Sequence, residues 1–304
     1  MCRNGGNRKS RKILEIGKKM LKQRVLVTGG SGFIGRYVVE DLWSRGHTVI
    51  APTHKDMNCL DREQMFRHVG EYKCDSIVHL ACLVPHCNKE DEGERARTNV
   101  EMTVNIILAC ARYRVPLLVY ASSTAVYGHQ APVVEVIPPI EMLTLYARSK
   151  RIGEELCSLL VNTRHISLRI SAPYGEGMRE TVISKFVKRA MNGETIEVQG
   201  SGNRMQDWTY VRDIAKGIRL SIESETANGV YNLGSGVGRS IKELVGIVVL
   251  LTQSKSKIVI GSRPDLQDNY RMKVSYRALE DAVGYVPEYS LEDGLREYIK
   301  TIYL

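Results

Sequence analysis

The chain has 304 residues, of which 43% are hydrophobic and 25% are charged, an ordinary composition for a soluble globular protein. No apolar run is long enough to span a bilayer, and the basic N-terminus lacks the apolar core of a secretory signal. We therefore expect a cytoplasmic protein with no membrane partner.

The formal net charge of +9 is concentrated at the N-terminus. Residues 1–20 contain seven lysines and arginines and one acid, so they carry +6 and leave only +3 for the rest of the chain. Nucleic-acid binding needs a basic face on the folded body, and this distribution does not supply one. We predict a basic, disordered tail over residues 1–20 and no nucleic-acid partner.

The seven cysteines are odd in number and form no Cys-x-x-Cys pair. This pattern favours free thiols over a disulfide framework, and it predicts no metal site. His79 and Cys82 continue an apolar strand, so we expect both side chains to pack in the core.

Strands and helices alternate along the first half of the chain. Short β-branched runs predict strands, and apolar residues at helical spacing predict helices between them. Such alternation requires a parallel sheet covered by helices on both faces, the doubly wound Rossmann-type α/β fold. The predicted strands are 24–28, 47–51, 75–81, 117–121 and 166–170, and the predicted helices are 35–45, 60–68, 94–113 and 145–162.

The alternation breaks after about residue 171, where elements become shorter and glycine more frequent. We predict a dinucleotide-binding domain over 21–170 and a smaller C-terminal part over 171–304 that binds the substrate. Residues 230–233 resemble one more strand, and we expect the segment near 229–236 to rejoin the main sheet.

A glycine loop follows the first strand. In Gly29-x-x-Gly32-x-x-Gly35, the first glycine permits a tight turn, the second lets backbone approach a pyrophosphate, and the third lets the helix pack closely. The helix N-terminus then offers amide donors and a positive dipole to phosphates. We predict a dinucleotide site here, with Phe33 and Ile34 in its first helical turn.

The end of the second strand bears on which dinucleotide binds. An acid there holds the adenosine ribose of NAD, but residues 52–55 contain none and offer Thr53 and His54 with a lysine. Arg36 could add to this basic corner. The cofactor is expected to be NAD or NADP, with a modest preference for NADP.

Tyr146 and Lys150 are four residues apart, so they share one face of the predicted helix. A tyrosine loses its proton near pH 10, and a fixed cation beside it favours the phenolate. Such a pair can take a proton from the hydroxyl of a sugar or alcohol.

These motifs occur in an order that resembles the extended short-chain dehydrogenase/reductase family, the NAD(P)-dependent epimerase/dehydratase group that acts on nucleotide sugars. The similarity covers nearly all of residues 22–304. It rests on the motifs Gly29-x-x-Gly32-x-x-Gly35, His79-Leu80-Ala81, Asn99, Ser122–Gly128, Tyr146-x-x-x-Lys150, Leu168–Gly175, Gly200–Asp213, Asn232–Gly236 and Gly284–Leu295.

The resemblance implies roles for particular residues. Ser123, Tyr146 and Lys150 would form the catalytic triad, and the substrate would be a nucleotide-diphosphate sugar. Arg204 and Arg263 would bind its phosphates, although Gln206 stands where the family often has arginine. The remaining implied contacts are Asn58, Cys59, Leu80, Ala81 and Asn99 for the cofactor, and Thr124 and Ser171 for the substrate.

Positions at which the chain departs from the family narrow the choice of reaction. Dehydratases of this group carry an Asp-Glu pair after the catalytic hydroxyl, whereas this chain has Thr124 and Ala125, and neither is the cysteine of the fucose-synthase type. The expected activity is a 4-epimerase similar to UDP-glucose 4-epimerase, acting through a transient 4-keto sugar. An NADPH-dependent 4-keto-6-deoxy sugar reductase and a non-catalytic dinucleotide sensor are the alternatives. By the same resemblance we expect a homodimer formed by helices 94–113 and 145–162.

Overall fold

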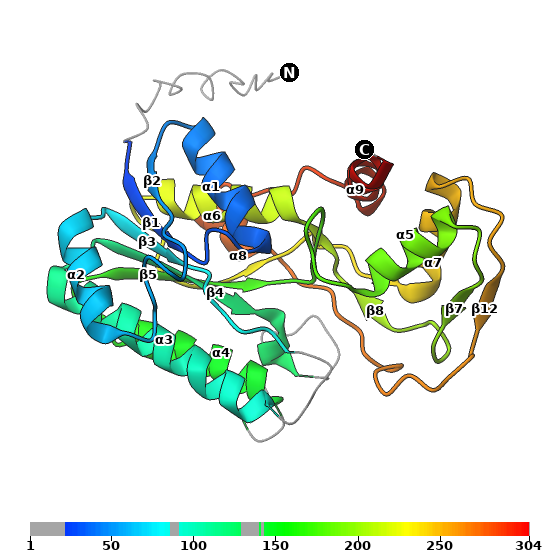
Figure 1. The fold of residues 1–304 in the computed structure, drawn as a ribbon, viewed down its shortest axis with the longest axis horizontal. Coiled ribbons are helices and arrows are strands. Elements are labelled where there is room, and N and C mark those ends of the chain that lie inside the picture. Colours follow the sequence, from blue (N-terminus) through cyan, green and yellow to red (C-terminus); the bar gives the residue numbers. More distant parts are fainter. Residues whose placement is uncertain (1–21, 86–90, 129–139, 141–142, 304) are drawn as a thin grey trace, which may run out of the picture.

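The computed structural model describes residues 22–85, 91–128, 140 and 143–303, so the predicted tail over residues 1–20 lies outside the described residues. A six-stranded parallel sheet forms its centre, in the order β10-β5-β4-β3-β1-β2 (Figure 1). The strands are β1 (Arg24–Thr28), β2 (Thr48–Ile50), β3 (Ser76–His79), β4 (Leu117–Ser123), β5 (Arg164–Ile170) and β10 (Gly229–Leu233).

Helices cover both faces of this sheet (Figure 1). One face carries α1 (Phe33–Ser44), α6 (Val211–Glu223) and α8 (Arg277–Val283), and the other carries α2 (Arg62–Tyr72), α3 (Glu92–Tyr113) and α4 (Leu145–Ser158). The doubly wound α/β fold predicted from the sequence is thus confirmed.

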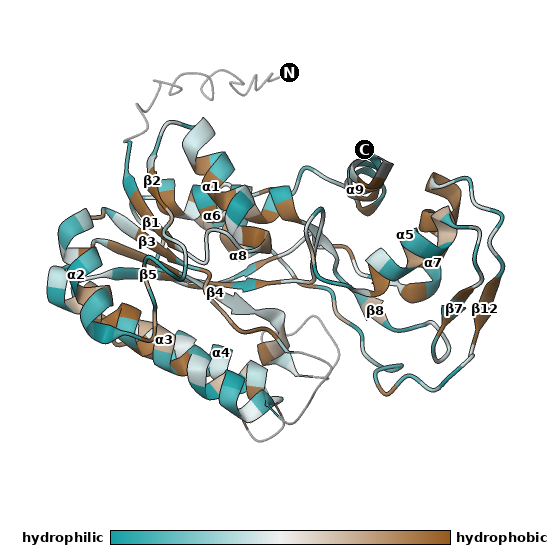
Figure 2. Ribbon diagram, viewed as in Figure 1, coloured by the Kyte–Doolittle hydropathy of each residue, from teal (hydrophilic) through white to brown (hydrophobic). Residues whose placement is uncertain are grey.

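The packing of strand β1 explains why its sequence is continuously apolar and does not alternate between apolar and polar residues. Val25 and Val27 pack into one core cluster with Val38 of α1, whereas Leu26 packs into the other with Ile77. Successive side chains of a strand point to opposite faces, and here all of these are fully buried. In Figure 2 the strands are largely hydrophobic, while the covering helices alternate hydrophilic and hydrophobic segments.

Caps move several element boundaries from their predicted positions. Helix α2 begins at Arg62, because the Asp61 side chain accepts a hydrogen bond from the Gln64 amide at 3.0 Å. It extends to Tyr72 and ends at Lys73, whose backbone is left-handed at φ 47°. Helix α4 ends at Ser158, four residues before its predicted end.

The C-terminal half adds a smaller lobe beside the sheet (Figure 1). Strands β7 (Ile196–Val198) and β12 (Ile258–Ile260) pair in parallel, next to α5 (Val182–Met191) and α7 (Ile241–Leu251). Strand β10 leaves this half and pairs with β5 in the main sheet. Short pairs and a final helix complete it: β6 (Pro173–Tyr174) with β9 (Thr209–Tyr210), β8 (Met205–Gln206) with β11 (Arg239–Ser240), and α9 (Leu291–Tyr303).

Among the described helices, none is both long and apolar enough to cross a membrane.

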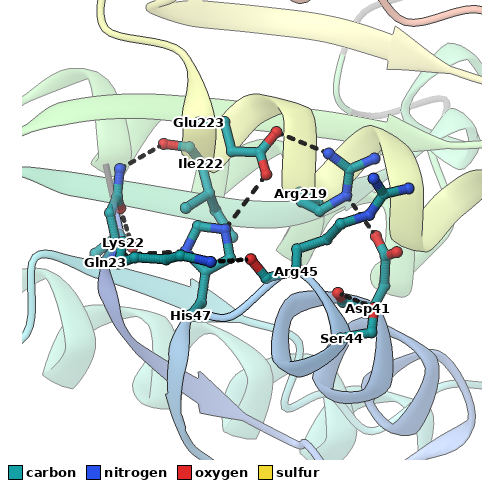
Figure 3. A network of polar contacts seen from close by, with 10 residues as sticks. Lys22, Gln23, Asp41, Ser44, Arg45, His47, Arg219, Ile222 and Glu223 are labelled. Atoms are coloured by element: carbon teal, nitrogen blue, oxygen red, sulfur yellow. Dashed lines mark hydrogen bonds and ion pairs between the residues drawn. The ribbon is translucent and has the colours of Figure 1, made fainter. Parts of the chain in front are cut away.

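A buried polar network ties α1 and α6 to the start of the sheet (Figure 3). His47 is 4% exposed, and its Nδ1 accepts the Gln23 backbone N–H at 3.3 Å, so its other ring nitrogen carries the proton that faces Glu223, also at 3.3 Å. Arg219 bridges Glu223 at 2.7 Å and Asp41 at 2.8 Å. The imidazole therefore joins the backbone before β1 to α6.

Replacing His47 with leucine should destabilise the fold. The change leaves a half-buried amide and part of a half-buried carboxylate without their imidazole partner, which costs about 1–3 kcal/mol. Urea unfolding measures the loss. The control is His54→Leu, since His54 is exposed, and surface changes usually stay within about 0.5 kcal/mol. Equal losses for the two variants would show that the network contributes nothing.

Candidate active site

The glycine loop is built from close backbone contacts. Gly29 has φ +70°, and a Cβ on it would lie 2.7 Å from the backbone nitrogen of Ala81. A Cβ on Gly35 would lie 2.1 Å from the Gly29 oxygen. Only glycine fits at either position, so the loop folds tightly against the end of β3 and the first turn of α1.

The first turn of α1 is open to an anion. Gly32 is its N-cap and supplies no side-chain hydrogen bond, and the turn contains no acid. The free amides of such a turn and the helix dipole attract phosphate. The loop therefore fits a dinucleotide pyrophosphate, and the nicotinamide of such a cofactor supplies a hydride acceptor and donor when bound.

The residues of the predicted triad come from two neighbouring elements. Ser123 is the last residue of β4, and its hydroxyl accepts the Ala125 amide at 3.2 Å. Tyr146 and Lys150 lie on one face of α4, whose N-cap Thr144 bonds the Ala147 amide at 3.2 Å. The helix start is thus fixed directly beside the strand end.

Lys150 is held as a buried cation. Its ammonium donates to the Ala121 carbonyl at 2.7 Å and lies 5.9 Å from the centre of the Tyr146 ring. Burial alone lowers the pKa of Lys150, but Cys82, Tyr146 and Glu154 together raise it above its ordinary value. The side chain therefore keeps its charge.

Opposing influences act on Tyr146. Burial raises the pKa of Tyr146 and outweighs the Lys150 charge and a hydrogen bond with Ser123, which lower it, so that the net value is about 12. The phenol is consequently protonated at neutral pH, and its two neighbours reduce the cost of removing the proton. This arrangement suits a group that exchanges a proton with a substrate hydroxyl.

One cavity of about 520 Å³ joins the triad to the glycine loop. Among the described residues, no carboxylate and no imidazole lines it. The predicted site residues that line it are Gly29, Gly32, Phe33, Ile34, Gly35, Leu80, Ser123, Tyr146 and Lys150.

Cys82 lies in this cavity and not in the core, so that expectation was wrong. The strand β3 ends at His79, three residues earlier, and the chain beyond it bends into the site. His79 is buried as expected and pairs with Thr28 at 2.7 Å. Burial, together with the Lys150 charge, lowers the pKa of His79 to about 3, so it stays neutral.

Arg204 and Arg263 meet in a second cavity of about 370 Å³. Val182 lines both cavities, so they adjoin. Arg204 donates to Gln267 at 2.9 Å and lies 3.5 Å from an Asp265 oxygen. The cavity is also lined by the cations Lys185 and Arg189 and by the acids Glu197 and Asp265, which leaves an excess of positive charge.

The corner after β2 contains an acid after all. Asp56 folds back on Thr53 and accepts its hydroxyl at 2.6 Å and its amide at 3.1 Å. These bonds lower the pKa of the exposed Asp56 carboxyl. Thr53 and His54 are exposed beside it, while Arg36 turns away and donates to the Glu176 carbonyl.

Four of the predicted cofactor contacts support neighbouring backbone and do not line the cavity. Asn99 bonds both backbone groups of Leu83, at 2.8 and 3.0 Å, and so holds the segment after β3. Asn58 accepts the Leu60 amide at 3.0 Å, Cys59 is buried, and Ala81 packs behind Gly29.

Two predicted substrate contacts belong to the interior. Ser171 is fully buried and donates to the Asp207 carbonyl at 2.8 Å, and Thr124 is 6% exposed with its hydroxyl 3.5 Å from the Ile170 carbonyl. Neither lines a described cavity, because both hydroxyls are used to join β-strand ends. Both assignments stay predictions.

The sequence interpretation missed several residues of the catalytic cavity. Met178, Arg179 and Thr181 come from the segment before α5, and Trp208 and Gln206 from the segment around β8 and β9. No spacing signal connects these segments with α4. Only Gln206, noted for replacing a usual arginine, offered a clue.

Gly35→Ala should weaken dinucleotide binding by at least about tenfold, because the new Cβ would displace the loop that holds the pyrophosphate. Fluorescence titration with NADH measures the affinity. Gly246→Ala is a matched control: Gly246 is also helical, and a Cβ added to it would meet nothing within 4 Å. Alanine should stabilise that helix by up to about 1 kcal/mol and leave binding unchanged. Unchanged affinity in Gly35→Ala would contradict the assignment of the loop.

Comparisons with known proteins agree with this site. The NAD dependent epimerase/dehydratase family matches residues 25–234. UDP-glucuronic acid decarboxylase 2 of Arabidopsis thaliana is 30% identical over 94% of this chain and 70% of its own. A putative UDP-glucose 4-epimerase of Methanocaldococcus jannaschii is 29% identical over 90% of this chain and 97% of its own.

A solved structure extends the comparison to the whole fold. The UDP-glucose 4-epimerase of Thermus thermophilus in complex with NAD superposes with a TM-score of 0.79, at 26% identity, over 92% of this chain and 99% of that one. The family match spans the glycine loop, the triad and β10. The chain therefore belongs to the NAD-dependent epimerase/dehydratase family and is an enzyme that uses NAD or NADP.

Proposed function

We propose that the chain is a nucleotide-sugar 4-epimerase that acts through a transient 4-keto sugar. The observation that carries the proposal is a single proton-exchanging triad in a cavity whose described lining contains no carboxylate and no imidazole. Removal of water from a sugar needs a separate acid and base, whereas oxidation and reduction of one carbinol need only one such group.

The mechanism uses the geometry of the triad. The phenolate form of Tyr146, stabilised by Lys150, would take the proton of the 4-hydroxyl and become the neutral phenol, while Ser123 would hold the same oxygen. A bound nicotinamide would supply the hydride acceptor and, for the return step, the hydride donor. Rotation of the ketone in the cavity presents its other face, and Tyr146 then returns the proton. The protein supplies orientation and electrostatic stabilisation, and its own groups are unchanged after the cycle.

The substrate class follows from the second cavity. Its cations Lys185, Arg189, Arg204 and Arg263 outnumber its acids, as binding of a diphosphate requires. Because this cavity adjoins the catalytic one at Val182, a nucleotide diphosphate there would place its sugar beside Tyr146. These contacts support a nucleotide-diphosphate sugar, with Arg204 and Arg263 as phosphate ligands.

The second candidate is an NADPH-dependent 4-keto-6-deoxy sugar reductase. The exposed Thr53, His54 and Lys55 after β2 favour it, since they suit a 2′-phosphate. Asp56 at the same corner favours NAD and therefore the epimerase. A dinucleotide sensor without catalysis is a third, weaker candidate, because the triad is intact. The cytoplasmic location stays a prediction.

The epimerase should interconvert UDP-glucose and UDP-galactose with no net consumption of NADH or NADPH, as followed by coupled assay. Tyr146→Phe should lower kcat by about 10²–10⁴-fold, because the proton acceptor is lost. Tyr231→Phe is the control, since that hydroxyl bonds only the Asn228 carbonyl, outside the lining of the cavity. Oxidation of NADPH by a 4-keto sugar, without interconversion of epimers, would establish the reductase instead.

We also propose that two copies associate through α3 and α4. An apolar groove of about 430 Å³ lies between these helices and carries exposed side chains, with Leu108 at 39%, Leu159 at 71% and Val161 at 91%. A self-complementary apolar face suits a two-fold dimer, as the family resemblance implied.

Leu108→Glu combined with Leu159→Glu should convert a dimer into a monomer, because each charge would be buried in the interface. Sedimentation velocity measures the mass. Leu266→Glu is the control, since Leu266 is 97% exposed and away from the groove. A parent protein that is already monomeric would refute this interface.

A further inference from the structure

A buried ion pair lies directly beneath the catalytic triad. Glu154 and Arg169 are 6% and 8% exposed, and the guanidinium donates to both carboxylate oxygens, at 2.9 and 2.7 Å. Ser122 donates a third, short hydrogen bond to the same carboxylate. Every oxygen of Glu154 is therefore occupied by a buried donor.

The network continues away from the carboxylate. Arg169 donates its remaining terminal nitrogen to the Tyr127 hydroxyl at 3.0 Å and lies 5.0 Å from the centre of that ring. Tyr127 in turn donates to Asn232 at 2.7 Å. The chain of bonds thus joins α4, β4, β5, the 3-10 helix η1 (Thr124–Tyr127) and β10.

Its members are the immediate neighbours of catalytic groups. Glu154 stands one helical turn after Lys150 on α4, and Ser122 precedes Ser123 on β4. Arg169 precedes Ile170, which lines the catalytic cavity. One carboxylate therefore binds the helix that carries Tyr146 and Lys150 to the strand that carries Ser123.

Stability alone does not require this pair. Burying two charges costs several kcal/mol per ion, and apolar side chains of similar size often replace such pairs without loss. What an apolar pair cannot do is fix the register of α4 through three directed bonds, one from Ser122 on β4 and two from Arg169 on β5. A displacement of about 1 Å at a catalytic group can cost about 100-fold in rate.

We propose that Glu154, held by Arg169 and Ser122, is a positioning residue that sets the separation of Lys150 and Tyr146 from Ser123. It touches neither substrate nor cofactor, and it acts through the placement of α4 on β4. The inference rests on the proposed roles of Tyr146 and Lys150 and holds for any sugar that they process.

Binding of NADH to full-length variants tests the proposal without a sugar. If Lys150 is displaced, Glu154→Gln should lower NADH affinity about tenfold, as loss of a supporting contact to a ligand commonly does. Ser122→Ala, which removes only one hydroxyl, should produce a smaller loss in a folded protein. The matched control is Glu155→Gln, since Glu155 is 65% exposed and pairs only with Arg151 at the surface; it should bind as the parent does.

The double variant Glu154→Leu with Arg169→Met tests whether the ion pair positions the triad or only stabilises the fold. Its unfolding midpoint should approach that of the parent, while NADH affinity stays low. Parent-like affinity in this variant, or in both Glu154→Gln and Ser122→Ala, would overturn the proposal and leave the pair a structural element only.

Sugar turnover gives a second readout. In Glu154→Gln the displaced Lys150 should lower the pKa of Tyr146 less than it does in the parent. The acidic limb of the plot of kcat against pH should therefore move to higher pH. The limb should not move in Glu155→Gln, and an unmoved limb in Glu154→Gln would count against positioning. Absence of turnover in the parent would reject the proposed function, whereas the NADH arm would still decide the role of Glu154.

Discussion

The burial of both faces of the parallel sheet is the constraint on which the molecule depends. With Val25 and Val27 packed on one side and Leu26 on the other, β1 has no face left for function. The groups of the candidate site lie at the edge where the strands end: the glycine loop and Cys82 follow strands of this sheet, and Ser123 is the last residue of β4. Ligands of open parallel sheets bind at this carboxyl edge for the same reason.

At that edge the glycine loop approaches the end of β3 and the first turn of α1 through backbone atoms, so one added side-chain atom would disturb the packing. Gly29 and Gly35 leave no room for a Cβ, so α1 presents its uncapped amides at the shortest distance from the sheet. On the other side of the cavity α4 is fixed by a cap at Thr144 and by the Glu154 carboxylate. The reacting groups are thus placed by rigid elements and not by loops.

The sequence predicted this edge well, because its signals are local. Periodicity predicted each strand of the sheet, and fixed spacings predicted the glycine loop and the Tyr146–Lys150 pair. Contacts that depend on side-chain direction were missed: the hydroxyl of Ser171 turns inward to Asp207, and Cys82 turns outward after β3 ends early. Asp56 lies just outside residues 52–55, where no acid was found, and it reaches the corner by folding back on Thr53.

The charges buried beneath the sheet edge bear on the proposed proton transfer by Tyr146. Glu154 is bound by Arg169, and together with Cys82 and Tyr146 it also raises the pKa of the second buried cation, Lys150. An anion beside a buried ammonium stabilises it, and ionised Tyr146 would supply such an anion on the same face of α4. Burial raises the pKa of Tyr146, but the same burial strengthens its attraction to Lys150. In the proposed reaction, the Lys150 charge would therefore favour the phenolate that accepts the proton of the sugar, and the phenolate would form again when Tyr146 returns that proton.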